Sequence, residues 1–189
     1  MGEGFLDLRR KGLEESYFAK ENERLIQEMK KKSRLVTIRK QLEFVLGRER
    51  PQLVNSLMAL DITKDTLPAL IWLPLVLVAW SDGYVDPNER QTIFEIVNAC
   101  GIRSKSSAEN ILEQWLINRP KQDLIWVWKE YIRAFKSGMA DDERPDFNRL
   151  IYGYSRNVAM ASGSLLKMGA ITTQERKYLK ELEQILFNE

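Results

Sequence analysis

The sequence contains no histidine and only one cysteine among its 189 residues. The lack of histidine excludes Ser-His-Asp and Cys-His catalytic groups, imidazole metal ligands and imidazole acid–base chemistry. Any catalysis would therefore rest on carboxylates, lysine or tyrosine. Cys100 cannot form a disulfide within the chain, and its position on the apolar side of a predicted helix indicates a buried thiol. This cysteine usage fits a reducing compartment, and we expect a cytoplasmic protein.

The sequence also lacks a strong net charge and a membrane-spanning run. Its 29 lysines and arginines nearly balance 27 aspartates and glutamates, so the formal net charge is +2 and nucleic acid is not the favoured partner. The most apolar run, residues 67–80, is shorter than the roughly 20 residues that span a bilayer, and Pro68 and Pro74 interrupt it. This run predicts a buried element with a kink at Pro74. With 44% apolar residues the chain can bury one substantial core, in which we expect Trp126 and Trp128.

Helix start and stop signals recur along the chain, and no segment shows the sustained apolar–polar alternation of a half-buried strand. The strongest signal comprises Asp86, Pro87 and Glu89, because the aspartate can cap a helix, the proline suits its first turn and the glutamate completes a capping box. A second such box begins at Ser106. The sequence therefore predicts an all-α helical bundle, with later helices over residues 87–100, 107–118, 124–135, 145–161 and 173–187.

The turn and capped helix after residue 78 have a counterpart near the C-terminus. Residues 78–83 (VAWSDG) match residues 158–163 (VAMASG), and residues 85–90 (VDPNER) match residues 171–176 (ITTQER). The second copy differs mainly by extra loop residues at 164–169. The sequence thus predicts two helix–loop–helix units of one design.

An Ala-x-x-Asp-Gly turn followed by a capped helix with glutamate at its third position resembles the tellurite-resistance TerB-like family. The likeness covers roughly residues 50–189. It implies an all-α fold, shared with the N-terminal domain of a membrane-anchored co-chaperone, and an association with stress response and membrane-linked protein assemblies. In that family, acidic loop residues have been viewed as metal ligands.

The candidate metal ligands of the first unit are Asp82, Asp86 and Glu89, since their oxygens suit Ca²⁺ or Mg²⁺. Helix capping is the competing explanation for the same side chains. The second unit loses two of the three carboxylates but keeps a capping pair, Thr172 and Glu175. This comparison favours capping, and we expect no cofactor, with a bound divalent cation as the alternative.

Residues 1–48 are densely charged and predict a helical arm, with residues 49–189 as the folded domain. The apolar residues of the arm are thinly spaced at helical steps, which gives a stripe too narrow to bury much by itself. Such a helix gains order from a protein partner or a second copy, or it folds back as a solvated helix on its own chain.

Residues 6–17, LDLRRKGLEESY, resemble the opening of the zeta-type inhibitory subunit of bacterial ATP synthases. They depart from its pattern at the first position, where the family usually has phenylalanine. The resemblance implies that the arm regulates a rotary ATPase by wedging between its subunits. The candidate partner-binding residues are Leu6, Arg9, Lys11, Leu13, Glu14 and Tyr17.

Residues 30–40, KKKSRLVTIRK, carry six positive charges and no acid. Such a run can lie on anionic lipid or on nucleic acid, or it can be the solvated face of a helix. The solvated helix is the favoured explanation, ending at Gly47 before Pro51 opens another helix, and peripheral contact with an anionic membrane is the alternative. The candidate basic patch consists of Lys30, Lys31, Lys32, Arg34, Arg39 and Lys40.

Three functions are compatible with these features. The favoured one is a non-enzymatic, stress-associated helical module that binds a protein partner through its arm. The second is an inhibitor-like regulatory subunit of an ATP synthase, as the resemblance of the arm implies. The third is a divalent-metal-binding or carboxylate-based enzyme, for which the acids of residues 141–146 would supply a general base or metal holder.

Overall fold

The computed structural model describes residues 3–161 and 171–187, with side chains described from residue 17 onward. Across these ranges it contains helices and no strand, which confirms the predicted all-α class. No described helix combines the length and the apolar character needed to cross a membrane. The elements are α1 (Glu3–Leu46), α2 (Pro51–Ala59), the 3₁₀ helix η1 (Leu67–Trp72), α3 (Leu73–Ala79), α4 (Pro87–Ala99), α5 (Ser107–Ile117), α6 (Gln122–Ser137), α7 (Glu143–Ala161) and α8 (Thr173–Phe187).

The chain divides into two units, which we call the arm (residues 1–41) and the body (residues 42–189). The sequence placed this boundary later, after residue 48. The difference arises because the end of α1 already contributes to the core of the body, where Leu42 is fully buried and Leu46 is 8% exposed. A buried side chain ties its backbone to the unit that covers it, even within an unbroken helix.

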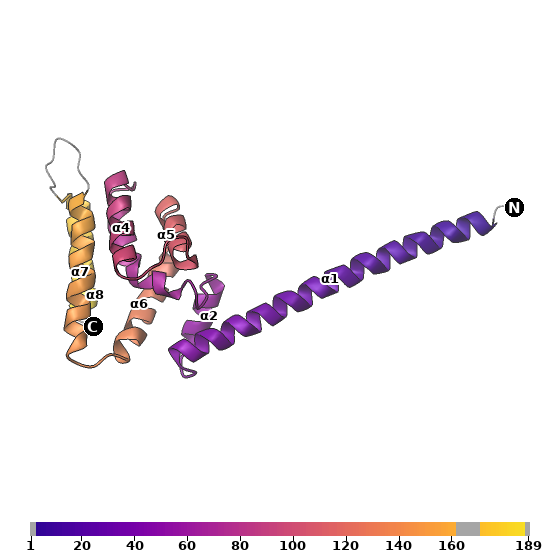
Figure 1. Ribbon diagram of the computed structural model, residues 1–189, viewed down its shortest axis with the longest axis horizontal. Coiled ribbons are helices and arrows are strands. Elements are labelled where there is room, and N and C mark those ends of the chain that lie inside the picture. The colour runs from indigo at the N-terminus through magenta and orange to yellow at the C-terminus, as the bar shows by residue number, and fades with distance from the viewer. Residues whose placement is uncertain (1–2, 162–170, 188–189) are drawn as a thin grey trace. The chain divides into compact units, whose positions relative to one another are not determined.

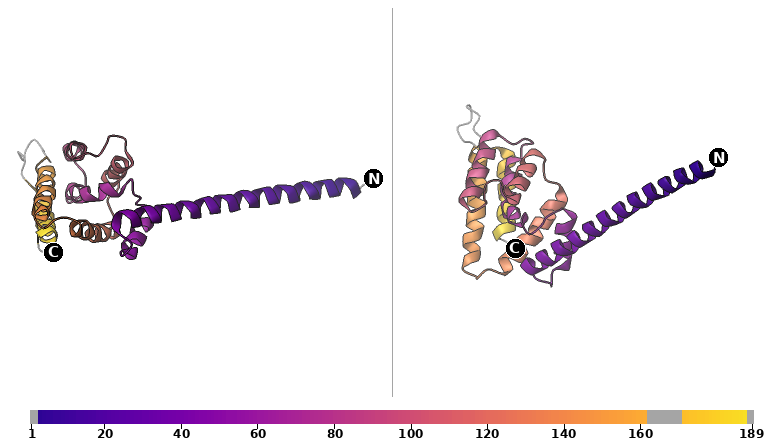
Figure 2. Two further views of the ribbon diagram at one scale, coloured as in Figure 1. Left: turned by 60° about the horizontal axis from the view of Figure 1, so that its bottom comes forward. Right: turned by 45° about the vertical axis from the view of Figure 1, so that its right-hand side comes forward.

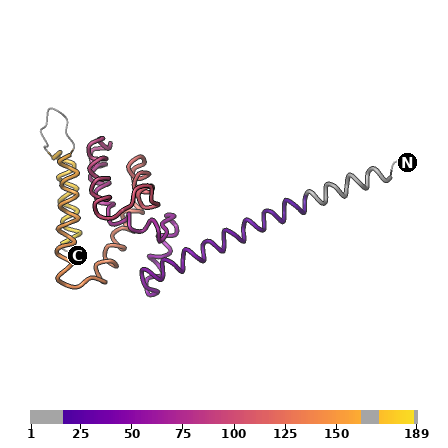
Figure 3. Tube along the Cα trace, in the orientation of Figure 1, coloured from indigo at the N-terminus to yellow at the C-terminus, as the bar shows by residue number. Residues whose placement is uncertain are grey.

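One continuous helix, α1, forms the described part of the arm and the first residues of the body (Figures 1 and 3). It ends before Gly47, as predicted, where a φ of 86° favours glycine because a side chain would be strained there. The next helix, α2, begins at Pro51, which is also as predicted. The proline suits this position because the first N–H groups of a helix have no intrahelical partner.

The core of the body is built on η1 and α3. All seven residues of α3 are buried, and this helix contacts η1, α4, α5, α7 and α8. Pro74 lies in the first turn of α3, where the missing N–H loses no helical hydrogen bond. The kink predicted at this proline is therefore a boundary between a 3₁₀ segment and an α-helix.

The other helices of the body cover α3 and one another. Helices α7 and α8 lie side by side, drawn in orange and yellow in Figures 1 and 2, and α4 also packs against α7. Helix α6 contacts α2 and η1. The indole N–H of Trp80, just after α3, donates a hydrogen bond of 2.8 Å to the carbonyl of Trp115 in α5. The first repeated unit, whose helices are α3 and α4, thus packs against the second, whose helices are α7 and α8.

Two residues predicted to be buried lie at the surface instead. Cys100, the C-cap residue of α4, is exposed, whereas Ile93 and Val97 of the same helix are buried. Its thiol lies 3.7 Å from the Tyr154 hydroxyl. Trp126 is 52% exposed, whereas Trp128 is buried as predicted. Residues two apart on a helix point in different directions, so one face of α6 cannot bury both rings.

We expect Leu75→Ala, in the middle of α3, to lower the free energy of unfolding by about 2–5 kcal/mol, because a fully buried leucine leaves a cavity when it is truncated. The matched control is Leu150→Ala on α7, where the side chain is 44% exposed and the loss should stay below about 1 kcal/mol. Urea unfolding followed by circular dichroism measures both. Equal losses would contradict the central place of α3.

Candidate functional site

The capping box predicted at the start of α4 is present. The Asp86 carboxylate accepts a hydrogen bond of 2.7 Å from the Asn88 N–H, and the Glu89 carboxylate accepts one of 2.9 Å from the Asp86 N–H. Gly83, with a φ of 101°, makes the turn before this cap. These bonds satisfy N–H groups that the first turn of a helix leaves without partners. We call Asp86 and Glu89 the first cap.

The second unit repeats this arrangement at the start of α8. The Thr172 N–H donates to the Glu175 carboxylate, and the Glu175 N–H donates to the Thr172 hydroxyl at 3.2 Å. We call this pair the second cap, and its presence confirms the capping predicted for the repeat. The matching turn at residues 162–163 and the extra loop at residues 164–169 lie outside the described residues.

The two capping glutamates meet inside the body. Glu89 is 2% exposed and Glu175 is 1% exposed. Burial raises the pKa of Glu89 from its ordinary value of 4.5 to about 8; repulsion from Glu175 and Asp82 and a hydrogen bond with Glu175 add to this, while the bond from the Asp86 N–H opposes it. Glu89 is therefore protonated in the folded protein near neutral pH.

The metal-ligand hypothesis concerned Asp82, Asp86 and Glu89. Among the residues that the structure describes, no group of three or more aspartate, glutamate or cysteine side chains is placed to hold a metal ion. Asp86 and Glu89 instead accept backbone N–H groups of the first cap, and Asp82 acts on Glu89 through its charge. Capping accounts for two of the three candidate carboxylates.

Three of the four acids at the start of α7 that the enzyme hypothesis invoked are engaged in local contacts, and the fourth, Asp142, is exposed. Arg144 pairs with Asp141 at 3.0 Å, and Arg149 pairs with Asp146. The Glu143 carboxylate accepts a hydrogen bond of 3.1 Å from the backbone N–H three residues earlier. These acids stabilise the beginning of a surface helix.

Four exposed apolar side chains of the arm lie on one side of α1, whereas Ile26 and Leu35 are exposed on other sides of the helix. Phe18 is 63% exposed, Leu25 44%, Met29 70% and Val36 52%. At about 3.6 residues per turn, their positions fall within one narrow sector of the helix. We call these four residues the stripe. A strip of apolar surface along a charged helix is suited to be covered by another helix.

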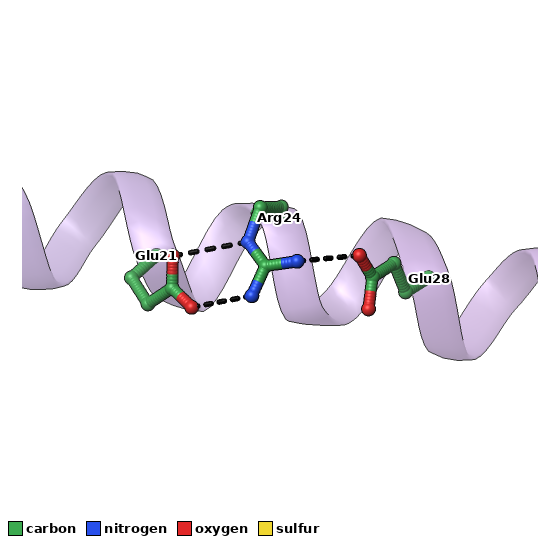
Figure 4. A network of polar contacts seen from close by, with 3 residues as sticks. All are labelled: Glu21, Arg24 and Glu28. Carbon is green, nitrogen blue, oxygen red and sulfur yellow. Dashed lines mark hydrogen bonds and ion pairs between the residues drawn. The ribbon is translucent and has the colours of Figure 1, made fainter.

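Ion pairs within the helix border one edge of the stripe. Arg24 donates to Glu21 at 3.0 and 2.5 Å and to Glu28 at 2.5 Å, so one guanidinium joins two turns of α1 (Figure 4). The hydrogen bond from Arg24 holds the pKa of Glu21 below its ordinary value. Pairs spaced three and four residues apart favour the helix. Among the side chains of α1 that the structure describes, these pairs stabilise the helix beside the stripe and leave the four residues of the stripe exposed.

The candidate basic patch does not lie on one face. Lys30, Lys31 and Lys32 are consecutive on α1, so their side chains point about 100° apart. Arg39 is half-buried, and the remaining five basic residues are exposed. A helix whose positive charges surround it presents no single face to a flat membrane.

One of the candidate partner-binding residues has a described side chain. Tyr17 is 66% exposed, and its ring meets Phe18 edge to face, with ring centres 5.9 Å apart. It therefore adjoins the stripe and extends the apolar surface at its N-terminal end. The other five lie in α1 with side chains outside the described set: Leu6, Arg9, Lys11, Leu13 and Glu14.

Two features of these sites were not predicted from the sequence. Phe18 and Val36 belong to the stripe, and the signal for them is the spacing of positions 18, 25, 29 and 36, which a helix places on one side. The meeting of Glu89 and Glu175 has a weaker signal. Equivalent residues of two repeated units can lie close together when the units pack against each other, but the sequence does not show how they pack.

A scan against protein-family models and searches of curated proteins and solved structures find no match to this chain. The resemblances to the TerB-like family and to the zeta-type subunit therefore stay predictions from the sequence.

We expect the stability of the protein to fall as the pH rises from about 5 to about 8. Over this window the folded protein keeps the Glu89 proton, whereas the unfolded chain has released it, so unfolding is favoured as protons become scarce. Glu89→Gln removes this titration while its amide oxygen can still accept the Asp86 N–H. As the pH rises from about 6 to about 8.5, the free energy of unfolding of the variant should rise relative to that of the unchanged protein by at least about 1 kcal/mol. This corresponds to roughly 2–4 °C in Tm.

Differential scanning calorimetry of both proteins across this range measures the effect. The control is Asp141→Asn, an exposed acid at the surface, for which the difference from the unchanged protein should not vary comparably with pH. Parallel pH profiles for Glu89→Gln and the unchanged protein would contradict a proton on Glu89.

Proposed function

We propose that this chain is a non-enzymatic helical scaffold that binds a protein partner through the stripe on its arm. The observation that carries the proposal is the exposure of Phe18, Leu25, Met29 and Val36 along one side of α1. Covering such surface is favourable because apolar area leaves water. The TerB-like resemblance suggests a stress-associated setting and a TerB-like body, and the single cysteine fits a cytoplasmic protein.

The carboxylates of the body support a binding function over catalysis. Glu89 and Glu175 are buried, and each accepts a hydrogen bond from a backbone N–H at the start of its own helix. Their role is therefore structural. Asp141 and Asp146 at the start of α7 pair with neighbouring arginines, and Glu143 bonds to the backbone. These five carboxylates have structural partners, and the proposal therefore rests on the exposed apolar residues of the arm.

The proposal predicts that Leu25→Gln combined with Met29→Gln abolishes partner binding by the full-length chain. Glutamine has a helix propensity close to those of leucine and methionine and adds no charge, so α1 should persist while the stripe loses its centre. The immobilised chain is incubated with a lysate of the cells that produce it, and the recovered proteins are quantified by mass spectrometry. Recovery of specific partners, further copies of the chain included, should fall at least tenfold.

The matched control is Glu23→Gln combined with Lys31→Gln. Both residues are exposed on the side of α1 opposite the stripe, and the two changes together leave the net charge unaltered. This control should recover the same partners as the unchanged chain. Equal recovery by the stripe variant and the control would reject the arm as the binding surface.

A further inference from the structure

The stripe has a symmetry that points to its occupant. Phe18 and Val36 lie nine residues on either side of Gln27, and Leu25 and Met29 lie two residues on either side of it. If a second copy of α1 runs in the opposite direction with its Gln27 at the same level, Phe18 meets Val36 and Leu25 meets Met29. Every residue of the stripe then finds an apolar counterpart.

We propose that the arm pairs with the arm of a second copy of this chain as an antiparallel two-helix coiled coil centred on Gln27, which rests on the proposed function of the arm as a binding surface. The positions 18, 22, 25, 29, 32 and 36 alternate in steps of four and three, the spacing of coiled-coil seams. The seam consists of two alternating kinds of position, here 18, 25 and 32 and then 22, 29 and 36, and in an antiparallel coiled coil a position of one kind faces a position of the other kind. With Gln27 at the centre, each of the six positions faces one of the other kind.

Charge selects the antiparallel direction. Residues 17–28 contain three acids and two bases, whereas residues 29–40 contain six bases and no acid. A parallel pair in register would place the two basic segments side by side, and their repulsion would oppose pairing. The antiparallel pair places each basic segment beside the segment that carries acids. Long-range charge thus favours the same direction as the stripe.

The polar seam positions fit the same register. Asn22 and Lys32 lie five residues on either side of Gln27, so each would face the other across the pair. An amide oxygen can accept from an ammonium group, and polar residues at seam positions fix register at some loss of stability. The two copies of Glu28 would lie near the centre, where each is already paired with its own Arg24 at 2.5 Å. The seam therefore specifies one register and predicts a modest affinity.

Cross-linking of the full-length chain tests direction and register. Cys100 is exposed and is first replaced by serine so that it does not react. Ala19→Cys is placed on one tagged copy and Ser33→Cys on another; both positions are exposed, on the edge of the stripe away from Arg24. In the proposed register the two positions lie at nearly the same level, whereas identical positions lie about 20 Å apart along the axis.

A short bis-maleimide should link Ala19→Cys to Ser33→Cys, with little linking of either variant to itself. Asn22→Cys reports the opposite direction, because the seam of a parallel pair would bring its two copies together. Efficient self-linking of Asn22→Cys, or no link between Ala19→Cys and Ser33→Cys at concentrations where the chain is a dimer, would overturn the antiparallel pair.

Sedimentation equilibrium of the chain with its own cysteine measures the affinity. Leu25→Gln with Met29→Gln should weaken the dimer at least about 100-fold, because four side chains of the seam are lost per dimer. Glu23→Gln with Lys31→Gln should leave it within about threefold.

The outcomes separate this inference from the function on which it rests. A chain that is monomeric at all concentrations but recovers other proteins through Leu25 and Met29 would overturn self-pairing and leave the proposed function standing. A monomeric chain whose recovery of partners does not depend on Leu25 and Met29 would overturn self-pairing and the proposed function together. A dimer with the predicted cross-links, lost in the stripe variant, supports both.

Discussion

The body depends on covering a helix that has no exposed face. Helix α3 is seven residues long, which is too short for stability by itself, and every residue in it is buried. It persists because η1, α4, α5, α7 and α8 pack against it, and each of these presents an apolar side inward. The arrangement also explains Pro74: an uninterrupted helix through residues 67–80 would have to bend at this proline, whereas a new start places the ring where helices accept it. The other helices are therefore arranged so that together they cover α3 on all sides.

The interior of the body also contains two polar groups, the carboxyl groups of the capping glutamates Glu89 and Glu175, and these need hydrogen-bond partners there. Each carboxyl must reach the first N–H groups of its own helix, and the starts of α4 and α8 bring both carboxyls into the interior. Two buried negative charges near each other would be strongly repelled where water is excluded. A proton held by Glu89 removes one charge and supplies a donor, and this is why burial and a raised pKa occur together. The proton on Glu89 thus allows both capping carboxyl groups to be buried, and in this way links helix capping to the packing of the core.

Local chemistry explains what the sequence predicted well. The caps at Asp86 and Thr172, the stop at Gly47 and the starts of several helices depend on neighbouring residues alone, and the structure contains them. The errors concern tertiary placement. Cys100 lies one residue beyond its helix, and Trp126 lies on the outer side of α6, and periodicity does not tell which side of a helix its neighbours will cover. The contact between Glu89 and Glu175 joins residues far apart in the chain, so no local pattern could reveal it.

The arm obeys the opposite constraint from the body. Its helix is stabilised within itself by backbone hydrogen bonds and by pairs such as Glu21–Arg24, which require no neighbour. The stripe adds only a little to that stability while it faces water, through apolar pairs such as Leu25 and Met29 four residues apart, and phenylalanine and valine are not needed for a charged helix to form. The proposed pairing would account for their regular placement, which is symmetric about Gln27 and flanked by unequal charge. The chain thus contains one unit with a buried apolar core and one whose stripe is exposed and would be covered by the proposed pairing.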